Sequence, residues 1–278
     1  MAEGRADQEV DRRAVLGWGM VGGVAGLAGL ASWGEHSGGH PQAAAAAHGG
    51  HRPAGQPGGD TLPKPGPEPT PSLPPLVPRT KPVFSLSDIL PQVPPNAIAL
   101  TIDDGPSPQW TPKVLDLLAR HKVKATFCLV GSQIKGHPSL AREIVDAGHH
   151  ICNHTYTHPQ PFAKLTADKV REEILRTTDE VYRATGVVPR LFRSPGGDWS
   201  PAVFSTVAEH GLTPIDWNDD PKDWSRPGVA TITQKLLAGR AGDILLCHDG
   251  GGDRSQTVLA LTTVIPTLLG RGLQFVTL

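Results

Sequence analysis

Residues Ala97 to Pro106 read AIALTIDDGP and contain two adjacent acidic side chains. The first four residues form an apolar run with the length of a buried strand. Asp103 and Asp104 follow at its carboxyl end, where Gly105 and Pro106 predict a turn. Adjacent side chains on an extended backbone point to opposite faces, so we expect each aspartate to have its own partner. Two carboxylates this close repel unless a cation or a shared proton stabilises them, so the stretch is either a solvated turn or part of a charged site.

The chain that continues from this stretch alternates between strand and helix patterns about seven times, with short connections. The expected helices cover 111–121, 140–147, 166–185, 201–210, 229–238 and 257–269, and the expected strands cover 97–100, 125–130, 149–153, 191–193, 212–217, 243–248 and 273–277. This order predicts an α/β fold in which parallel strands are joined by crossover helices.

Ionisable side chains that could serve in catalysis or metal binding lie at the carboxyl ends of these strands. They are Asp103, Asp104, His154, Arg193, Asp220 and His248. The carboxyl edge of a parallel sheet or barrel is where active sites form, so this placement predicts a site at that edge.

Two histidines four residues apart, His154 and His158, lie just past the strand expected at 149–153. On a continued strand they would lie roughly 13 Å apart, too far to share an ion at bonds of about 2 Å. Chelation therefore requires the chain to coil just past that strand. Asp103 or Asp104 would then complete a set of two histidines and one carboxylate, which leaves positions open for water and substrate. The alternative is two ordinary polar histidines in a turn.

Composition excludes some classes of protein. The chain has 278 residues and a net charge of −1, so no basic patch indicates a nucleic-acid partner. The three cysteines, Cys128, Cys152 and Cys247, lie in apolar runs and form no CxxC motif. We expect buried free thiols, with a disulfide between two of them as the alternative.

The amino-terminal third has a different composition. Arg12 and Arg13 precede a glycine-rich apolar run, which is typical of an export signal and resembles the twin-arginine kind. The run is also about long enough for a membrane anchor. We therefore assign residues 1–47 to a signal or anchor, 48–95 to a linker rich in Pro and Gly, and 96–278 to the folded domain. The linker has too little apolar surface to offset its ordering entropy, so we expect a disordered, extended spacer.

Five separated segments of the folded domain carry recognisable motifs. They are 101–106, TIDDGP; 154–158, HTYTH; 193–197, RSPGG; 220–224, DPKDW; and 245–249, LLCHD. In this order they resemble the motifs of the polysaccharide deacetylase family, also called the NodB-homology group or carbohydrate esterase family four. The resemblance covers most of residues 97–278 and none of the amino-terminal region. It implies an irregular (β/α) barrel with about seven parallel strands, and a NodB-like catalytic domain over 96–278.

The resemblance also implies roles for individual residues. Asp103 would be the general base and His248 the general acid. Arg193 would orient Asp103 and would itself be held by Asp223. A divalent metal, with Zn²⁺ expected and Co²⁺ or a similar ion as the alternative, would be held by Asp104, His154 and His158.

Substrate contacts follow from the same resemblance. Trp224 and Leu246 would wall the pocket for the acetyl methyl group, and Pro195 and Gly196 would contact the substrate beside them. The family usually has an aromatic residue, often Tyr, where Gly196 stands. Glycine keeps the backbone N–H that would help to hold an oxyanion, but it removes a wall and some rigidity.

The implied activity is that of an exported, metal-dependent deacetylase, located in the cell envelope, the wall or outside the cell. It would hydrolyse the acetamide of N-acetylated sugars, in peptidoglycan or a chitin-like glycan, to a free amine and acetate. An O-acetyl esterase of xylan-type glycans is a second hypothesis, because one site can attack either bond. A catalytically weak glycan-binding wall protein is the third, although Asp103 and His248 argue against it. The expected partner is the acetylated polysaccharide, and membrane contact is expected only through an uncleaved amino-terminal segment.

Overall fold

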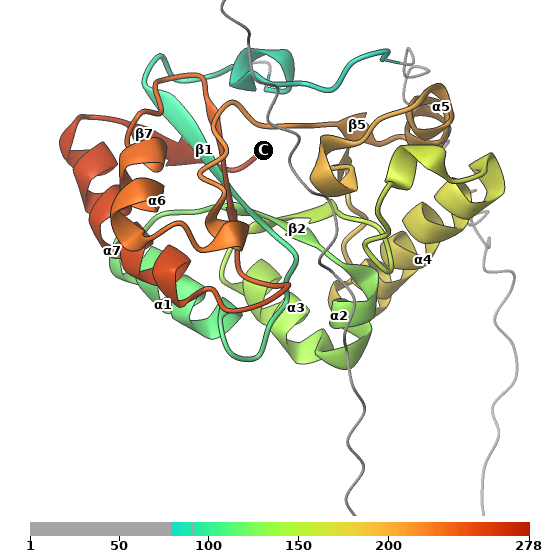
Figure 1. The fold of residues 1–278 in the computed structure, drawn as a ribbon, viewed down its shortest axis with the longest axis horizontal. Helices are drawn as coiled ribbons and strands as arrows, with labels where there is room; N and C mark the ends of the chain where they lie inside the picture. Colours follow the sequence, from blue (N-terminus) through green and yellow to red (C-terminus); the bar gives the residue numbers. More distant parts are fainter. Residues whose placement is uncertain (1–78, 91) are drawn as a thin grey trace, which may run out of the picture. The chain divides into compact units, whose positions relative to one another are not determined.

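Figure 1 shows a computed structural model of the chain, which describes residues 79–90 and 92–278. The expected signal or anchor and most of the expected linker lie outside these residues. Within the described ranges, no helix is both long and apolar enough to cross a membrane.

Seven strands form one sheet, and every strand pair in it is parallel. The strands are β1 (Ala97–Asp103), β2 (Thr126–Leu129), β3 (His150–Asn153), β4 (Leu191–Phe192), β5 (Thr213–Pro214), β6 (Ile244–His248) and β7 (Gln274–Val276). Their order is β5-β4-β3-β2-β1-β6, with β7 also paired to β1. The prediction of an α/β fold with about seven parallel strands, curled into an irregular barrel, is confirmed.

Helices flank this curled sheet (Figure 1). They are α1 (Thr111–Arg120), α2 (Gly131–Gly136), α3 (Pro138–Asp146), α4 (Ala167–Thr185), α5 (Pro201–Glu209), α6 (Val229–Leu236) and α7 (Ser255–Gly270). The described residues also contain four 3₁₀ turns: η1 (Leu86–Asp88), which precedes β1, and η2 (Phe162–Lys164), η3 (Pro195–Gly197) and η4 (Asp223–Ser225), which lie between helices. All six expected helices are present. Helix α2 was not predicted from the sequence, because it is short and has no side-chain cap.

Capping explains where some of these helices begin and end. The Thr166 hydroxyl accepts a hydrogen bond from the Lys169 N–H, and Gly186 ends α4 with a left-handed φ of 76°. The expected helix over 166–185 therefore lies between these two residues. Thr111 is the first residue of α1, and its hydroxyl accepts from the Ser107 N–H and donates to Asp249.

The edges of the sheet are joined by a segment that the sequence reading had assigned to the linker. Val83 N–H donates to the Pro214 carbonyl at 2.9 Å, and the Leu86 N–H donates to the Gly242 carbonyl at 3.1 Å. Both side chains are buried and pack in the barrel interior. Burial of these two apolar side chains offsets the entropy cost of ordering this segment. The packed domain therefore includes residues before 96, which were expected to belong to the linker.

Side-chain alternation along β1 directs its residues to two different regions. Ile98, Leu100 and Ile102 belong to the apolar cluster packed beneath the helices. Ala97 and Ala99 belong to the interior cluster, and Asp103 continues the same face. The strand therefore places the Asp103 carboxylate inside the barrel, at its carboxyl end. All three cysteines are buried free thiols, as expected.

Candidate metal and catalytic site

The carboxyl edge of the sheet gathers the residues that the sequence placed there. Asp103 ends β1, His154 follows β3, Arg193 follows β4 and His248 ends β6. These strands lie in one run of the sheet, β4-β3-β2-β1-β6, so side chains far apart in sequence meet at one edge.

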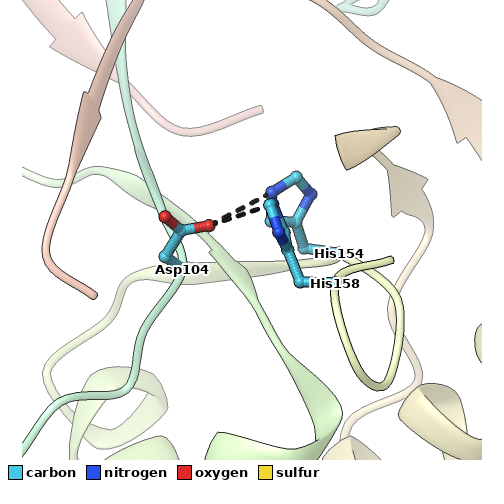
Figure 2. Close-up of side chains that lie close together, drawn as sticks. All are labelled: Asp104, His154 and His158. Carbon is cyan, nitrogen blue, oxygen red and sulfur yellow. Dashed lines mark ion pairs between the residues drawn. The ribbon is translucent and has the colours of Figure 1, made fainter. Parts of the chain in front are cut away.

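Asp104, His154 and His158 converge on one point (Figure 2). The Asp104 Oδ1 atom lies 3.6 Å from His154 Nε2 and 3.3 Å from His158 Nε2. One ligand atom from each residue lies within 4.8 Å of the others. His154 Nε2 is also 3.6 Å from Asp103 Oδ2, so both aspartates lie near this histidine in addition to their own separate partners.

A tight turn, and not a helical turn, brings the two histidines together. The Asn153 side-chain oxygen accepts the Thr155 N–H at 3.0 Å, and Thr155 and His158 adopt left-handed φ values of 65° and 55°. The Glu173 carboxylate on α4 accepts the backbone N–H groups of Tyr156 and Thr157. The chain therefore coils just past β3, as chelation requires, and the imidazole centroids lie 4.9 Å apart.

These three residues fit a divalent metal. The Asp104 Oδ1 atom is buried and has no hydrogen-bond partner within the described residues. His154 Nδ1 is hydrogen-bonded to the Arg193 carbonyl at 2.8 Å, which fixes the ring and leaves Nε2 for a ligand. Burial favours a raised pKa for Asp104, but the nearby imidazoles of His154, His248 and His158 hold it well below the usual value. An ionised carboxylate with two imidazole nitrogens is a zinc-type donor set.

Arg193 holds the Asp103 carboxylate. Its Nη1 atom donates to Asp103 Oδ1 at 2.7 Å and to the Thr101 hydroxyl at 2.8 Å, while Nη2 donates to the Asp216 carbonyl at 3.0 Å. Both the guanidinium and the Asp103 carboxylate are buried. This geometry gives Asp103 one defined orientation, as the family resemblance implied.

Asp223 was expected to hold Arg193, and this expectation is wrong. Its carboxylate instead accepts from His248 Nδ1 at 2.7 Å, from the His248 backbone N–H at 2.9 Å and from the Thr257 hydroxyl at 2.8 Å. Asp223 lies on η4, which contacts β6, whereas the Arg193 guanidinium lies in the interior between β1 and residue 216. Burial opposes the charge on His248, but the Asp223 hydrogen bond outweighs it and raises the pKa of His248 to about 9.

One cavity of about 320 Å³ collects most of the expected site residues. Its lining comprises Asp103, Asp104, His154, His158, Gln160, Gly196, Trp217, Asp220, Trp224, Leu246 and His248. The structure therefore brings the expected metal, base, acid and pocket residues together. Pro195 is the exception among the expected substrate contacts, since it lines the adjoining hollow with Gln160 and Gly196.

Gln160 and Trp217 are site residues that the sequence reading missed. Gln160 lies two residues past His158, and Trp217 ends an expected strand. Both positions therefore lie next to expected site residues or at the carboxyl edge of the sheet, which could have marked them as candidates. Gly196 has a left-handed φ of 64°, and a Cβ atom there would lie 3.3 Å from the Gln160 amide nitrogen. Gln160 thus borders the space beside Gly196. Trp224 is 53% exposed, so it forms a rim of the cavity more than a buried wall.

Comparisons with known proteins identify the family of this chain. Residues 91–215 match the family model described as polysaccharide deacetylase. The chain is 42% identical over 183 residues to a peptidoglycan-N-acetylglucosamine deacetylase of Bacillus cereus, covering 65% of this chain and 85% of that protein. The chain belongs to the polysaccharide deacetylase family. It is accordingly a hydrolase of the carbohydrate esterase family four kind.

Two further polysaccharide deacetylases support this assignment. A chitooligosaccharide deacetylase of Bradyrhizobium sp. is 41% identical over 191 residues, covering 64% of this chain and 87% of that protein. The crystal structure of the Bc1960 peptidoglycan N-acetylglucosamine deacetylase superposes with a TM-score of 0.64 at 37% identity, covering 67% of this chain and 88% of the other.

Proposed function

We propose that this polysaccharide deacetylase is an exported enzyme that uses a divalent metal to hydrolyse the acetamide of N-acetylated sugars, with peptidoglycan as the first candidate substrate and chitin-like glycans next. The observation that carries the proposal is the convergence of Asp104, His154 and His158 beside Asp103 and His248 in one cavity. A metal triad flanked by a carboxylate and an imidazole provides a base and an acid for one hydrolysis.

The metal would be held by Asp104, His154 and His158, with zinc the best fit to their donors. When bound, it would supply Lewis acidity to the acetamide carbonyl and to water. A tetrahedral oxyanion would also receive the Gly196 N–H, and one such donor is typically worth on the order of 10²–10³-fold in rate.

Asp103 would take the proton of the attacking water. Its Oδ1 atom is committed to Arg193, so Oδ2, on the side of His154, is the oxygen left for the proton. The guanidinium fixes the direction of the carboxylate. A positioned base of this kind typically contributes about 10²–10⁴-fold.

His248 would protonate the departing amine. Asp223 occupies Nδ1, so Nε2 is the ring nitrogen available to the substrate. Because the pKa of His248 is raised to about 9, the imidazole carries its proton at neutral pH, as a general acid must.

The choice of an N-acetylated glycan rests on the relatives, whose names specify peptidoglycan N-acetylglucosamine and chitooligosaccharide. Leu246 and Trp224 line the cavity, and they offer apolar contact for an acetyl methyl group. Export is proposed because such glycans lie outside the cytoplasm and because Arg12 and Arg13 precede an apolar run. Residues 1–47 would be the signal or anchor, and the Pro-rich and Gly-rich segment after them the spacer.

The deciding experiment measures acetate release by the full chain from peptidoglycan, chitooligosaccharides and acetylated xylan, with mass spectrometry of the products. Each reaction is run with zinc, with cobalt and with a chelator. We expect metal-dependent acetate and free amine from the first two glycans. Release from xylan alone would assign an O-acetyl esterase, and glycan binding without any release would assign a binding protein. Fractionation of cells that produce the wild-type chain and an Arg12→Lys, Arg13→Lys variant tests export.

A further inference from the structure

The loop that follows β6 lies directly against Asp104. Its sequence, residues 249–254, is DGGGDR. A Cβ atom on Gly250 would overlap the Asp104 carbonyl, and one on Gly251 would lie 2.7 Å from Asp104 Oδ2. The loop therefore packs against both the backbone and the side chain of this aspartate, at an approach that only glycine permits.

Arg254 ends this loop and is fixed on both sides. It occupies the position just before α7 and is only 4% exposed. Its Nε atom donates to the Gly250 carbonyl at 2.6 Å, and its Nη2 atom lies 3.9 Å from Asp104 Oδ2. A buried guanidinium held in this way presents its charge at a defined place.

The two oxygens of Asp104 face different neighbours. Oδ1 points toward the two imidazoles, while Oδ2 points away from them (Figure 2). The side chain starts from a backbone with a left-handed φ of 75°, which is uncommon for a residue other than glycine. Contacts from outside the turn are therefore needed to fix the carboxylate, and Arg254 supplies the cationic one on the Oδ2 side.

We propose that Arg254 is a positioning residue for the metal site: it holds Asp104 Oδ2, so that Oδ1 alone is presented to the ion shared with His154 and His158. This inference rests on the proposed metal site. The competing effect is electrostatic, because a guanidinium near the site also repels a cation. Orientation and repulsion predict opposite changes in metal affinity when Arg254 is replaced, so one measurement separates them.

The test measures zinc affinity of the full chain by competition with a chromophoric chelator. We compare the wild type with Arg254→Gln, Arg254→Lys and the control Arg226→Gln. Arg226 is exposed and pairs with Asp253 of the same loop at 2.9 Å, whereas the ion pairs of Asp104 within the described residues are with His154, His158 and Arg254. We expect about 10–100-fold weaker zinc binding in Arg254→Gln, partial recovery in Arg254→Lys and wild-type affinity in Arg226→Gln.

The visible absorption of the Co²⁺-loaded proteins gives a second readout that a merely structural role would not move. A carboxylate released from Arg254 can rotate and offer both oxygens, which raises the coordination number and weakens the d–d bands. We expect weaker bands in Arg254→Gln and wild-type bands in Arg226→Gln. Circular dichroism of the metal-free proteins checks that the variants fold, and if the Gln variant does not, the Lys variant decides.

The outcomes separate the two proposals. If the wild type binds neither zinc nor cobalt, the metal site fails and the role of Arg254 fails with it. If the wild type binds zinc and Arg254→Gln binds it equally well with unchanged cobalt bands, only the role of Arg254 is overturned. Tighter binding by Arg254→Gln also overturns it, because the guanidinium would then act chiefly by repulsion.

Discussion

Histidines stand at both ends of β3, and their surroundings differ. Beyond its carboxyl end, His154 lies 3.6 Å from the carboxylates of both Asp103 and Asp104. At its amino end, His149 Nδ1 accepts the Ala125 N–H at 3.1 Å, and the ring packs edge-on against Phe127. Burial, with the nearby charge of Lys124, lowers the pKa of His149 to about 4, so this ring stays neutral.

The hollows at the two ends differ in the same way. The one at the amino ends of β3, β4 and β5 is the larger, at about 620 Å³, but no Asp or Glu of the described chain lines it. The cavity at the carboxyl edge is about 320 Å³ and contains three aspartates. The two hollows therefore differ chiefly in their aspartate carboxylates, and not in volume or in the presence of histidines. The aspartates make the hollow at the carboxyl edge the one that can hold a cation and move protons.

The largest expected effect comes from removing the carboxylate that both histidines face. We expect Asp104→Ala to lose zinc binding and to lower kcat/KM by at least about 10³-fold, because the several kcal/mol supplied by a metal are lost. In a thermal unfolding series, zinc at about 100 times its dissociation constant should stabilise the wild type by about 2.7 kcal/mol and leave the variant unchanged. Zinc-dependent stabilisation of Asp104→Ala would contradict the ligand assignment.

Asp103 is expected to have a slightly smaller effect of another kind. Asp103→Asn keeps the shape beside Arg193 but cannot accept a proton, so turnover should fall by about 10²–10⁴-fold. Zinc affinity, measured by chelator competition, should remain close to that of the wild type because Asp104, His154 and His158 are intact. Unchanged turnover would remove Asp103 from the role of base.

Local patterns in the sequence explain why the fold could be predicted. The apolar run before Asp103 and the caps at Thr166 and Gly186 each act within a few residues, so strand and helix positions followed from them. The segment around Val83 and Leu86 was misassigned because its Pro-rich neighbours dominate the composition. Only contact with β5 and with the residues before β6 makes its two apolar side chains a part of the barrel.

The site could be predicted as a set of residues but less well as a set of contacts. The strand order follows from the α/β rules, so the gathering of Asp103, His154 and His248 at one edge was predictable. Pairing between side chains depends on distances of a few ångströms that no spacing encodes. The family resemblance implied that Asp223 holds Arg193, although it binds His248. Gln160 was missed although it lies two residues past His158, because the sequence does not show that the loop brings it to Gly196.

The Asp223–His248 pair extends the comparison with His149. Of these two histidines, His248 is the one whose ring is hydrogen-bonded to a carboxylate. The pair keeps His248 protonated up to about pH 9, so if His248 is the general acid as proposed, the alkaline limb of the kcat/KM profile should lie near that value. Asp223→Asn lowers the pKa of His248, and the limb should move to lower pH with a loss of about 10-fold at the wild-type optimum. A pH profile with an unmoved limb would show that another group sets it.

The smallest expected effect lies at the amino end of β3 and concerns stability. The folded-state pKa of His149, about 4, is below the usual 6.5, so the unfolded chain binds more protons between these values. His149 therefore contributes stability that is fully present above about pH 6.5 and is lost as the pH falls toward 4. His149→Asn keeps an acceptor for the Ala125 N–H but does not titrate. Between pH 7 and pH 4 the variant should therefore lose less free energy of unfolding than the wild type, by on the order of 1–3 kcal/mol, as measured by denaturant unfolding. Zinc affinity should stay at the wild-type value; if it fell with this substitution, the two ends of the strand would be coupled, and carboxylates alone would not account for their difference.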